Sequence, residues 1–187
     1  MQQRFSVCVY CGSRAGADPA FVAAAQTLGT AIADNGWRLV YGAGDRGIMG
    51  AVAEAAAQGG AELLGIIPTH LVDVEAPEGR FGSRIITETM HERKKVMLMN
   101  ADAIVMLPGG AGSLDEFFEA LTWAQLGLHA KPIILCDVNG FWQPLEALID
   151  HVIDQGFAED SLKAQVSFLP DPDALVAALS RLAASKE

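Results

Sequence analysis

Short apolar runs alternate with segments of helical periodicity along the whole chain. The apolar runs predict strands at residues 5–10, 37–41, 62–67, 84–87, 102–107, 131–136 and 166–168. The segments between them predict helices at residues 18–35, 48–58, 90–100, 116–126, 142–155 and 171–186. Such alternation is typical of an α/β fold with a doubly wound, mostly parallel sheet and helices on both faces, a Rossmann-like arrangement. The one long connection, residues 69–83, is rich in acids, Pro and Gly and is predicted to be an irregular, mobile loop.

The length of 187 residues suits one domain, residues 1–187, with enough bulk to bury a full core. The hydrophobic fraction is 51% and the mean hydropathy is +0.26, yet no apolar run approaches the ~20 residues of a membrane span. The surplus of hydrophobic residues is therefore assigned to buried strands, to helix faces and to a subunit interface. The apolar segment from Phe5 to Tyr10 is too short for a secretory signal, so we expect a cytoplasmic protein with no membrane partner.

The formal net charge is −10 and the sequence pI is about 4.7. Nucleic acid is an unexpected partner for so acidic a chain, because nucleic-acid binding requires a basic face. A small phosphate can still be bound through local N–H groups and one or two positive side chains.

The chain has three cysteines, Cys8, Cys11 and Cys136, which are too few for a disulfide framework and cannot all pair because their number is odd. Cys8-x-x-Cys11 matches a redox spacing, but Cys8 lies inside the first predicted strand and Cys11 at its end, and no helix begins between them. A structural or incidental pair is therefore favoured over a thioredoxin-type site. A zinc site would need a second ligand pair, and because none is suitably spaced, no metal is expected.

A glycine-rich stretch follows the strand at 102–107. Pro108 ends that strand, the glycines at 109, 110 and 112 let the backbone turn closely, and Ser113 is predicted to begin a helix. Bare N–H groups and the positive end of a helix dipole then meet at one place, which favours phosphate binding. Ser113-x-x-Glu116 also matches a capping box that only satisfies helix-end donors. A cap alone does not need three glycines, so a ligand site is favoured.

Three loops meet at the carboxyl ends of the predicted strands, where ligands of such sheets bind. These loops are residues 11–14, 42–50 and 107–116, and Arg93 belongs to the same rim. From the first two loops we expect the substrate to be contacted by Gly12, Ser13, Gly44, Gly47 and Met49.

Gly42-x-Gly44-x-x-Gly47 matches a dinucleotide-binding motif between a strand and a helix. However, it follows the second strand instead of the first, and the next strand ends in Ile67-Pro68 without the expected acid. NAD(P) binding is therefore disfavoured. A loop that holds a mononucleotide, or one that simply packs closely, fits the pattern better.

Arg93 and Lys94 lie in the first turns of a helix that begins with a second capping box, Thr89-x-x-Glu92. They can be two solvated cations, but the dipole disfavours cations there, which suggests an anionic partner across the cleft. His91 has no identified partner and is assigned to packing or to the surface. The positive end of the following helix favours an ionised Glu116 at pH 7, which could stabilise an oxocarbenium-like transition state and orient water.

Several motifs in this order resemble the Lonely Guy (LOG) family of cytokinin riboside 5′-monophosphate phosphoribohydrolases, many of which were once labelled lysine decarboxylases. They are Cys11-Gly12-Ser13, Gly42-x-Gly44-x-x-Gly47-x-Met49-Gly50, Met90-His91-Glu92-Arg93-Lys94, Pro108-Gly109-Gly110-x-Gly112-Ser113-x-x-Glu116 and Leu121-Thr122-Trp123-Ala124-Gln125-Leu126-Gly127. The resemblance covers nearly the whole chain. It implies hydrolysis of an N6-substituted adenosine 5′-monophosphate, or of AMP, to the free base and ribose 5-phosphate.

The resemblance implies that Arg93 and Glu116 are the catalytic pair. It implies nucleotide binding by Glu75, Lys94, Gly109, Gly110, Gly112, Ser113, Asp115 and Thr122. Ser113 replaces the usual Thr, while Ala111 and Asp115 replace a common Tyr and Glu, which can alter the fit of the base or ribose. The resemblance also implies a homodimer.

Cleavage with water needs no cofactor, so none is expected. Two other classes stay open: a pyridoxal-dependent decarboxylase, for which no lysine has a recognisable context, and a nucleotide sensor that binds AMP without consuming it. The sequence leaves open which 5′-monophosphate is the substrate and whether a partner subunit completes the site.

Overall fold

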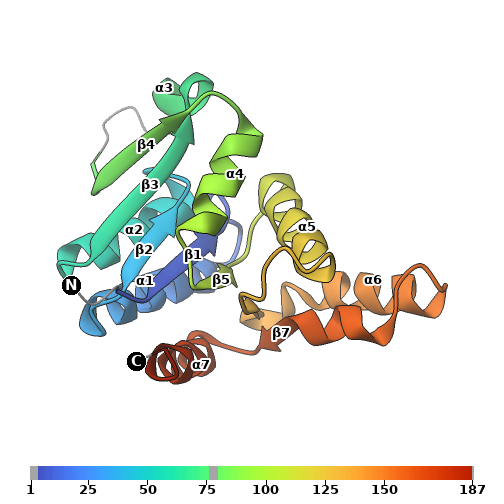
Figure 1. Cartoon of the computed structure of the whole chain (residues 1–187). Helices are drawn as coiled ribbons and strands as arrows, with labels where there is room; N and C mark the ends of the chain where they lie inside the picture. The colour runs from blue at the N-terminus through green and yellow to red at the C-terminus, as the bar shows by residue number, and fades with distance from the viewer. Residues whose placement is uncertain (1–3, 76–79, 187) are drawn as a thin grey trace.

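The computed structural model describes residues 4–75 and 80–186, and its strands form one seven-stranded parallel sheet. The strand order is β4-β3-β2-β1-β5-β6-β7 (Figure 1). The strands are β1 (Ser6–Tyr10), β2 (Arg38–Tyr41), β3 (Glu62–Pro68), β4 (Ser83–Thr87), β5 (Ala103–Met106), β6 (Ile133–Cys136) and β7 (Val166–Leu169). The α/β doubly wound fold is confirmed, and every described strand pair is parallel.

Helices cover both faces of the sheet. The α-helices are α1 (Pro19–Asp34), α2 (Gly47–Gln58), α3 (Val72–Glu75), α4 (Met90–Met99), α5 (Ala111–Gln125), α6 (Gln143–Asp154) and α7 (Pro172–Ala184). Three 3₁₀ turns join them, η1 (Thr69–Leu71), η2 (Val138–Gly140) and η3 (Asp160–Gln165). Helices α1, α2 and α7 pack on one face, and α4, α5 and α6 pack on the other.

The alternation of side chains along β1 shows how one strand serves two cores. Val7 and Val9 point into the cluster with α1, α2 and α7. Cys8 and Tyr10 point into the cluster with α4, α5 and α6. Because both faces are covered, the strand is apolar at nearly every position, as parallel strands with two buried faces require.

Prolines and aspartates fix the starts of two helices where the sequence predicted them. Asp18 caps α1 by accepting a hydrogen bond from the backbone N–H of Ala20 at 2.8 Å, and Pro19 follows as the first helical residue. Asp171 caps α7 in the same way, accepting from the N–H of Ala174 at 2.8 Å. The aspartate side chain accepts a hydrogen bond from an N–H of the first helical turn, which has no acceptor within the helix. Proline has no N–H, so it needs no acceptor at that position.

The winding of the chain reverses at β1, because β2 to β4 extend the sheet on one side and β5 to β7 on the other. The connections after β1 and β5 therefore leave the sheet on opposite faces and open a crevice between them. The backbone N–H of Gly12, in the first connection, donates a hydrogen bond to the carbonyl of Pro108, in the second, at 3.0 Å. The predicted loops thus meet at this edge.

Two predictions about local structure were wrong. Residues 69–83 are not irregular throughout, because η1 and α3 occupy 69–75 and β4 begins at Ser83; residues 76–79 of that predicted loop lie outside the described part. Helix α5 begins at Ala111, five residues before the predicted start at 116 and two before Ser113. Gly110 supplies the non-helical N-cap, with φ of −100° and ψ of −151°.

Candidate active site

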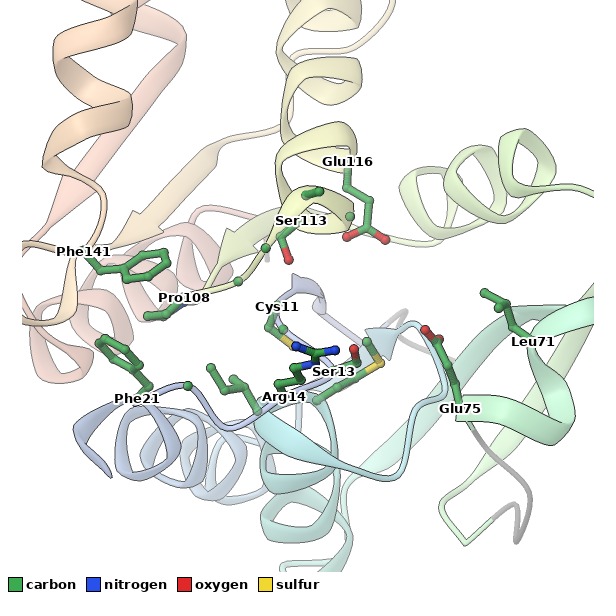
Figure 2. A pocket seen from close by; sticks show the side chains of 18 of the residues that line it. Cys11, Ser13, Arg14, Phe21, Leu71, Glu75, Pro108, Ser113, Glu116 and Phe141 are labelled. Atoms are coloured by element: carbon green, nitrogen blue, oxygen red, sulfur yellow. The ribbon is translucent and has the colours of Figure 1, made fainter. Parts of the chain in front are cut away.

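A cavity of about 440 Å³ opens at the carboxyl edge of the sheet, where β1 and β5 separate (Figure 2). Most of its wall comes from the loop after β1, the N-terminus of α2, the glycine turn before α5 and the first turns of α5. The lining residues are Cys11, Gly12, Ser13, Arg14, Gly16, Phe21, Ile48, Met49, Leu71, Glu75, Met90, Arg93, Pro108, Gly109, Gly110, Ala111, Gly112, Ser113, Glu116 and Phe141. The volume suits a small organic ligand.

The N-terminus of α5 reaches the cavity without a side-chain cap. Gly110 is the N-cap and its helix end receives no side-chain hydrogen bond, so the Ser113–Glu116 capping box does not form. Ser113 is instead buried in the first helical turn. A β-carbon at Gly110 or Gly112 would meet no atom within 4 Å, so both positions face open space. The first N–H groups of a helix have no partner within that helix, so here they are available to an anion.

Gly109 is the glycine that packing demands. A β-carbon there would collide with the Ser113 side chain and lie 2.9 Å from the backbone nitrogen of Gly12. The absence of a side chain lets the two loops approach closely enough for the Gly12–Pro108 hydrogen bond.

Arg93 extends from α4 and is only 3% exposed. Its Nη2 donates a hydrogen bond to the backbone carbonyl of Gly42 at 3.0 Å and lies 3.7 Å from Oε2 of Glu75. Its Nε is buried without a hydrogen-bond partner in the described structure. A buried guanidinium with an unpaired N–H is costly, so this group is prepared for a ligand acceptor.

Glu116 projects from the second turn of α5 into the same cavity and is 8% exposed. Burial raises the pKa of its carboxyl to about 7, and the nearby Arg93 opposes that rise, while Asp115 and Glu75 reinforce it. The sequence predicted an ionised carboxylate at pH 7 because it placed Glu116 in the first turn. The helix begins earlier, and with a pKa of about 7 the carboxyl is ionised only in part at that pH, because loss of hydration opposes the charged form.

Glu75, the last residue of α3, brings a second carboxylate to Arg93. Its Oε2 is buried without a hydrogen-bond partner in the described residues, and its backbone carbonyl accepts from the N–H of Asp45 at 3.0 Å. This backbone bond holds α3 against the 42–47 loop. Two acids and one guanidinium therefore line one end of the cavity.

Lys94 turns away from the cavity. Its Nζ lies 2.9 Å from Oδ2 of Asp115 and 3.0 Å from Oε2 of Glu119, so it joins α4 to α5. Burial alone would lower the pKa of Lys94, but the two hydrogen-bonded carboxylates raise it above its usual value. Neither Arg93 nor Lys94 is a solvated surface cation. Of the two alternatives predicted for His91, packing or the surface, the structure shows the surface: the side chain is exposed and its Nδ1 lies 3.9 Å from Oε2 of Glu119.

The Gly42–Gly47 loop packs closely against its neighbours. The first N–H groups of α2 are already used, since Met49 donates to the carbonyl of Gly12 at 3.1 Å and Ile48 donates to that of Arg14 at 3.4 Å. Gly44 donates its N–H to Sδ of Met49 at 3.1 Å. Of the alternatives drawn from the sequence, close packing therefore describes this loop.

The structure brings most of the predicted site residues into one cavity. Those that line it are Gly12, Ser13, Met49, Glu75, Arg93, Gly109, Gly110, Gly112, Ser113 and Glu116. Those that do not line it are Gly44, Gly47, Lys94, Asp115 and Thr122. Asp115 and Thr122 lie on an exposed stripe of α5 that also carries Phe118 and continues to Leu126, the C-cap of the helix, at spacings of three and four residues.

Sequence reasoning missed three lining residues of distinct chemistry. Arg14 directly follows Ser13 in the first rim loop, and that adjacency was the only available signal. Phe21 of α1 and Phe141 after η2 form an edge-on ring pair with centroids 5.3 Å apart, at the opposite end of the cavity from Glu75 (Figure 2). No local pattern links residues that are 120 positions apart.

The three cysteines are free and buried, and burial raises the pKa of each thiol. The Cys8–Cys11 spacing is therefore structural, as predicted.

Among the described residues, no group of three or more His, Cys, Asp and Glu side chains is arranged to hold a metal ion. None of the described helices has both the length and the apolar character needed to cross a bilayer.

The chain is similar to known proteins over most of its length. Residues 49–179 match the family described as "Possible lysine decarboxylase". The chain is 43% identical over 162 residues to the cytokinin riboside 5′-monophosphate phosphoribohydrolase LOG of Oryza sativa subsp. japonica, which covers 86% of this chain and 67% of that protein. It is 39% identical over 170 residues to LOG7 of Arabidopsis thaliana, covering 91% of this chain and 78% of that protein.

Solved structures show the same fold at lower identity. The molybdenum cofactor binding protein of Rippkaea orientalis superposes with a TM-score of 0.75 and 21% identity, covering 97% of this chain and 99% of that one. The molybdenum cofactor carrier protein of Chlamydomonas reinhardtii superposes with a TM-score of 0.73 and 23% identity, with the same coverage. At this identity the likeness shows the fold alone.

Proposed function

Because the chain belongs to the Lonely Guy family of cytokinin riboside 5′-monophosphate phosphoribohydrolases, we propose that it hydrolyses the N-glycosidic bond of adenosine 5′-monophosphate or an N6-substituted derivative. The products are the free base and ribose 5-phosphate. One observation carries the proposal: the uncapped N-terminus of α5 and the Arg93–Glu116 pair line a single cavity. Residues 1–187 would then act as one nucleotide-binding hydrolase domain.

The 5′-phosphate binds at the glycine turn. The backbone N–H groups at the start of α5 point into the space that Gly110 and Gly112 leave open, and the Ser113 hydroxyl adds a donor. Gly12, Ser13 and Met49 form the facing wall of the cavity.

Glu116 and Arg93 carry out the chemistry at the ribose. An ionised Glu116 accepts a proton from water as the water oxygen attacks the anomeric carbon. The bond to the base nitrogen breaks with its electron pair on that nitrogen, and the proton lost by the water is returned to the base, which leaves neutral. The same carboxylate stabilises the positive charge that develops on the ribose ring. Arg93, through its unpaired Nε–H, positions the phosphate or the departing base. Glu75 lies beside Arg93 and accepts hydrogen bonds from the nucleotide.

The remaining expected binding residues act from outside the cavity. Lys94 holds Asp115 beside Glu116, while Gly44 and Gly47 keep the second loop in place. We also propose a homodimer that covers the exposed α5 stripe of Asp115, Phe118, Thr122 and Leu126, since Phe118 and Leu126 are apolar and 40% and 68% exposed. The cytoplasmic location expected from the sequence stays a prediction.

Incubation of the purified protein with AMP and with isopentenyladenosine 5′-monophosphate tests the proposal. We expect free base and ribose 5-phosphate to be released, and chromatography measures both products. Tight binding of both nucleotides without base release would identify the sensor alternative. An absorbance band of bound pyridoxal phosphate, with carbon dioxide released from lysine, would identify the decarboxylase alternative and overturn the proposal.

A further inference from the structure

Arg14 is a cation at the cavity to which neither the sequence motifs nor the family resemblance gives a role. Its side chain lines the cavity, and in Figure 2 the guanidinium lies toward the middle of the group of lining side chains, near Cys11 and Ser13. Within residues 4–75 and 80–186, no ion pair and no side-chain hydrogen bond involves Arg14.

The neighbouring cations are engaged in part or in full. Arg93 donates to the carbonyl of Gly42 and faces Glu75 at 3.7 Å, which leaves its Nε–H for a ligand. Lys94 is neutralised by Asp115 and Glu119, outside the cavity. The cavity itself is lined by two carboxylates, those of Glu75 and Glu116. A phosphate dianion entering this site would therefore meet repulsion unless another positive charge balances it.

The backbone of Arg14 is fixed although its side chain is uncommitted. Its carbonyl accepts the N–H of Ile48 at 3.4 Å, and a β-carbon on Gly47 would collide with the backbone of Ser13 and Arg14. Two residues earlier, Gly12 donates its N–H to Pro108, immediately before the glycine turn. Arg14 therefore begins from a fixed point on the wall that faces the N-terminus of α5.

We infer that Arg14 determines specificity for the 5′-phosphate: its guanidinium binds the phosphate oxygens that the first N–H groups of α5 bind from the other side. The planar guanidinium matches two phosphate oxygens at once, which a single ammonium cannot do. The chain thereby selects a nucleotide over the corresponding nucleoside. This inference rests on the proposed function for the identity of the ligand.

The test compares Arg14→Gln, Arg14→Lys and a matched control, Arg181→Gln, which removes the same charge from the exposed side of α7. Calorimetry measures the Kd of each protein for AMP and for adenosine. Titration of AMP in the presence of inorganic phosphate measures the affinity of each protein for phosphate by competition. Arg14→Gln should weaken AMP and phosphate binding about 10- to 100-fold, as expected for loss of a charge-assisted bidentate contact. Adenosine binding should change less than about twofold, since no phosphate is present. Arg14→Lys should recover part of the loss, and Arg181→Gln should match the wild type.

Steady-state kinetics gives a second readout: Arg14→Gln should raise KM for AMP with kcat nearly unchanged. Equal weakening of AMP and adenosine would overturn the inference, because Arg14 would then only shape the wall, and so would unchanged phosphate affinity. Failure of the wild type to cleave AMP defeats the proposed function instead, and the phosphate competition still decides the role of Arg14. Thermal unfolding of each variant confirms that it is folded.

Discussion

The guanidinium of Arg93 occupies the space that a β-carbon on Gly42 would need, and it donates a hydrogen bond to the carbonyl of that glycine at 3.0 Å. A glycine from the 42–47 loop thus sets the position of an arginine on α4. This relationship gives the loop a role in the site even though its helix end is already capped by other carbonyls.

Gly42→Ala should therefore displace Arg93 and lower kcat/KM for AMP by at least about tenfold, because a misplaced catalytic group costs rate steeply. A double-mutant cycle with Arg93→Ala checks the mechanism. In the Arg93→Ala background the glycine change should have little further effect. Full additivity of the two losses would mean that Gly42 acts through another group.

Glu116→Gln should retain AMP binding and lose turnover. The amide keeps the shape of the side chain but cannot accept the proton of the attacking water, so kcat should fall about 10²- to 10⁴-fold. Calorimetry should give a Kd for AMP within about threefold of the wild type, a change well below the contribution of one hydrogen bond to a charged group. Normal turnover by this variant would remove Glu116 from the proposed role.

The pH dependence of kcat/KM should show Glu116 directly. Because the ionised form is the active one and burial raises the pKa of Glu116 to about 7, activity should rise as pH increases through that range. Asp115 contributes to the raised pKa, so Asp115→Asn should shift the acidic limb to lower pH. A shift in the opposite direction would contradict the electrostatic explanation.

The same carboxyl should make stability depend on pH. Between 4.5 and about 7 the folded state holds a proton on Glu116 that the unfolded state has released, so the free energy of unfolding falls as pH rises through this window. Glu116→Gln removes this loss and should stabilise the ligand-free protein by up to about 3 kcal/mol at pH 8. Urea unfolding at pH 4.5 and pH 8 measures the difference, which should nearly vanish at the lower pH.

The proposed homodimer should depend on the exposed stripe of α5. Phe118→Asp places a charge on this stripe and should shift the protein to a monomer in light-scattering measurements, because a buried unpaired charge is costly. Phe157→Asp, at an apolar residue beyond α6 that is 86% exposed, serves as the matched control. Dissociation by the control alone would place the interface elsewhere.

Local chemistry explains why most of the fold was predictable. The buried strands are continuous apolar runs, and Asp18-Pro19 and Asp171-Pro172 specify two helix starts almost by themselves. The start of α5 was missed because an N-cap glycine leaves no side-chain signal. The short turns at 69–75 were missed because four residues are too few to show a helical period.

The site was predictable where the backbone carries the function and unpredictable where long-range packing does. The glycines at 109, 110 and 112 mark the site in the sequence itself: Gly109 lets two loops approach closely, and Gly110 and Gly112 leave open space beside the start of α5. The direction of Lys94, toward Asp115 instead of the cavity, depends on how α4 packs against α5. The pKa of Glu116 depends on burial by segments distant in the sequence, and so does the inclusion of Phe21 and Phe141 in the wall.

Two helices, α2 and α5, begin beside the same crevice, but α2 already gives its leading amides to the loop after β1. Of these two helix ends, only that of α5 therefore keeps its leading N–H groups free for an anion. In the proposed function, a nucleotide whose phosphate binds there is held in one position, and the length of its sugar determines which bond lies beside Glu116. If the N–H groups of α2 were free, they would form a second anion site. A fraction of the bound nucleotide molecules would then lie with the scissile bond away from Glu116.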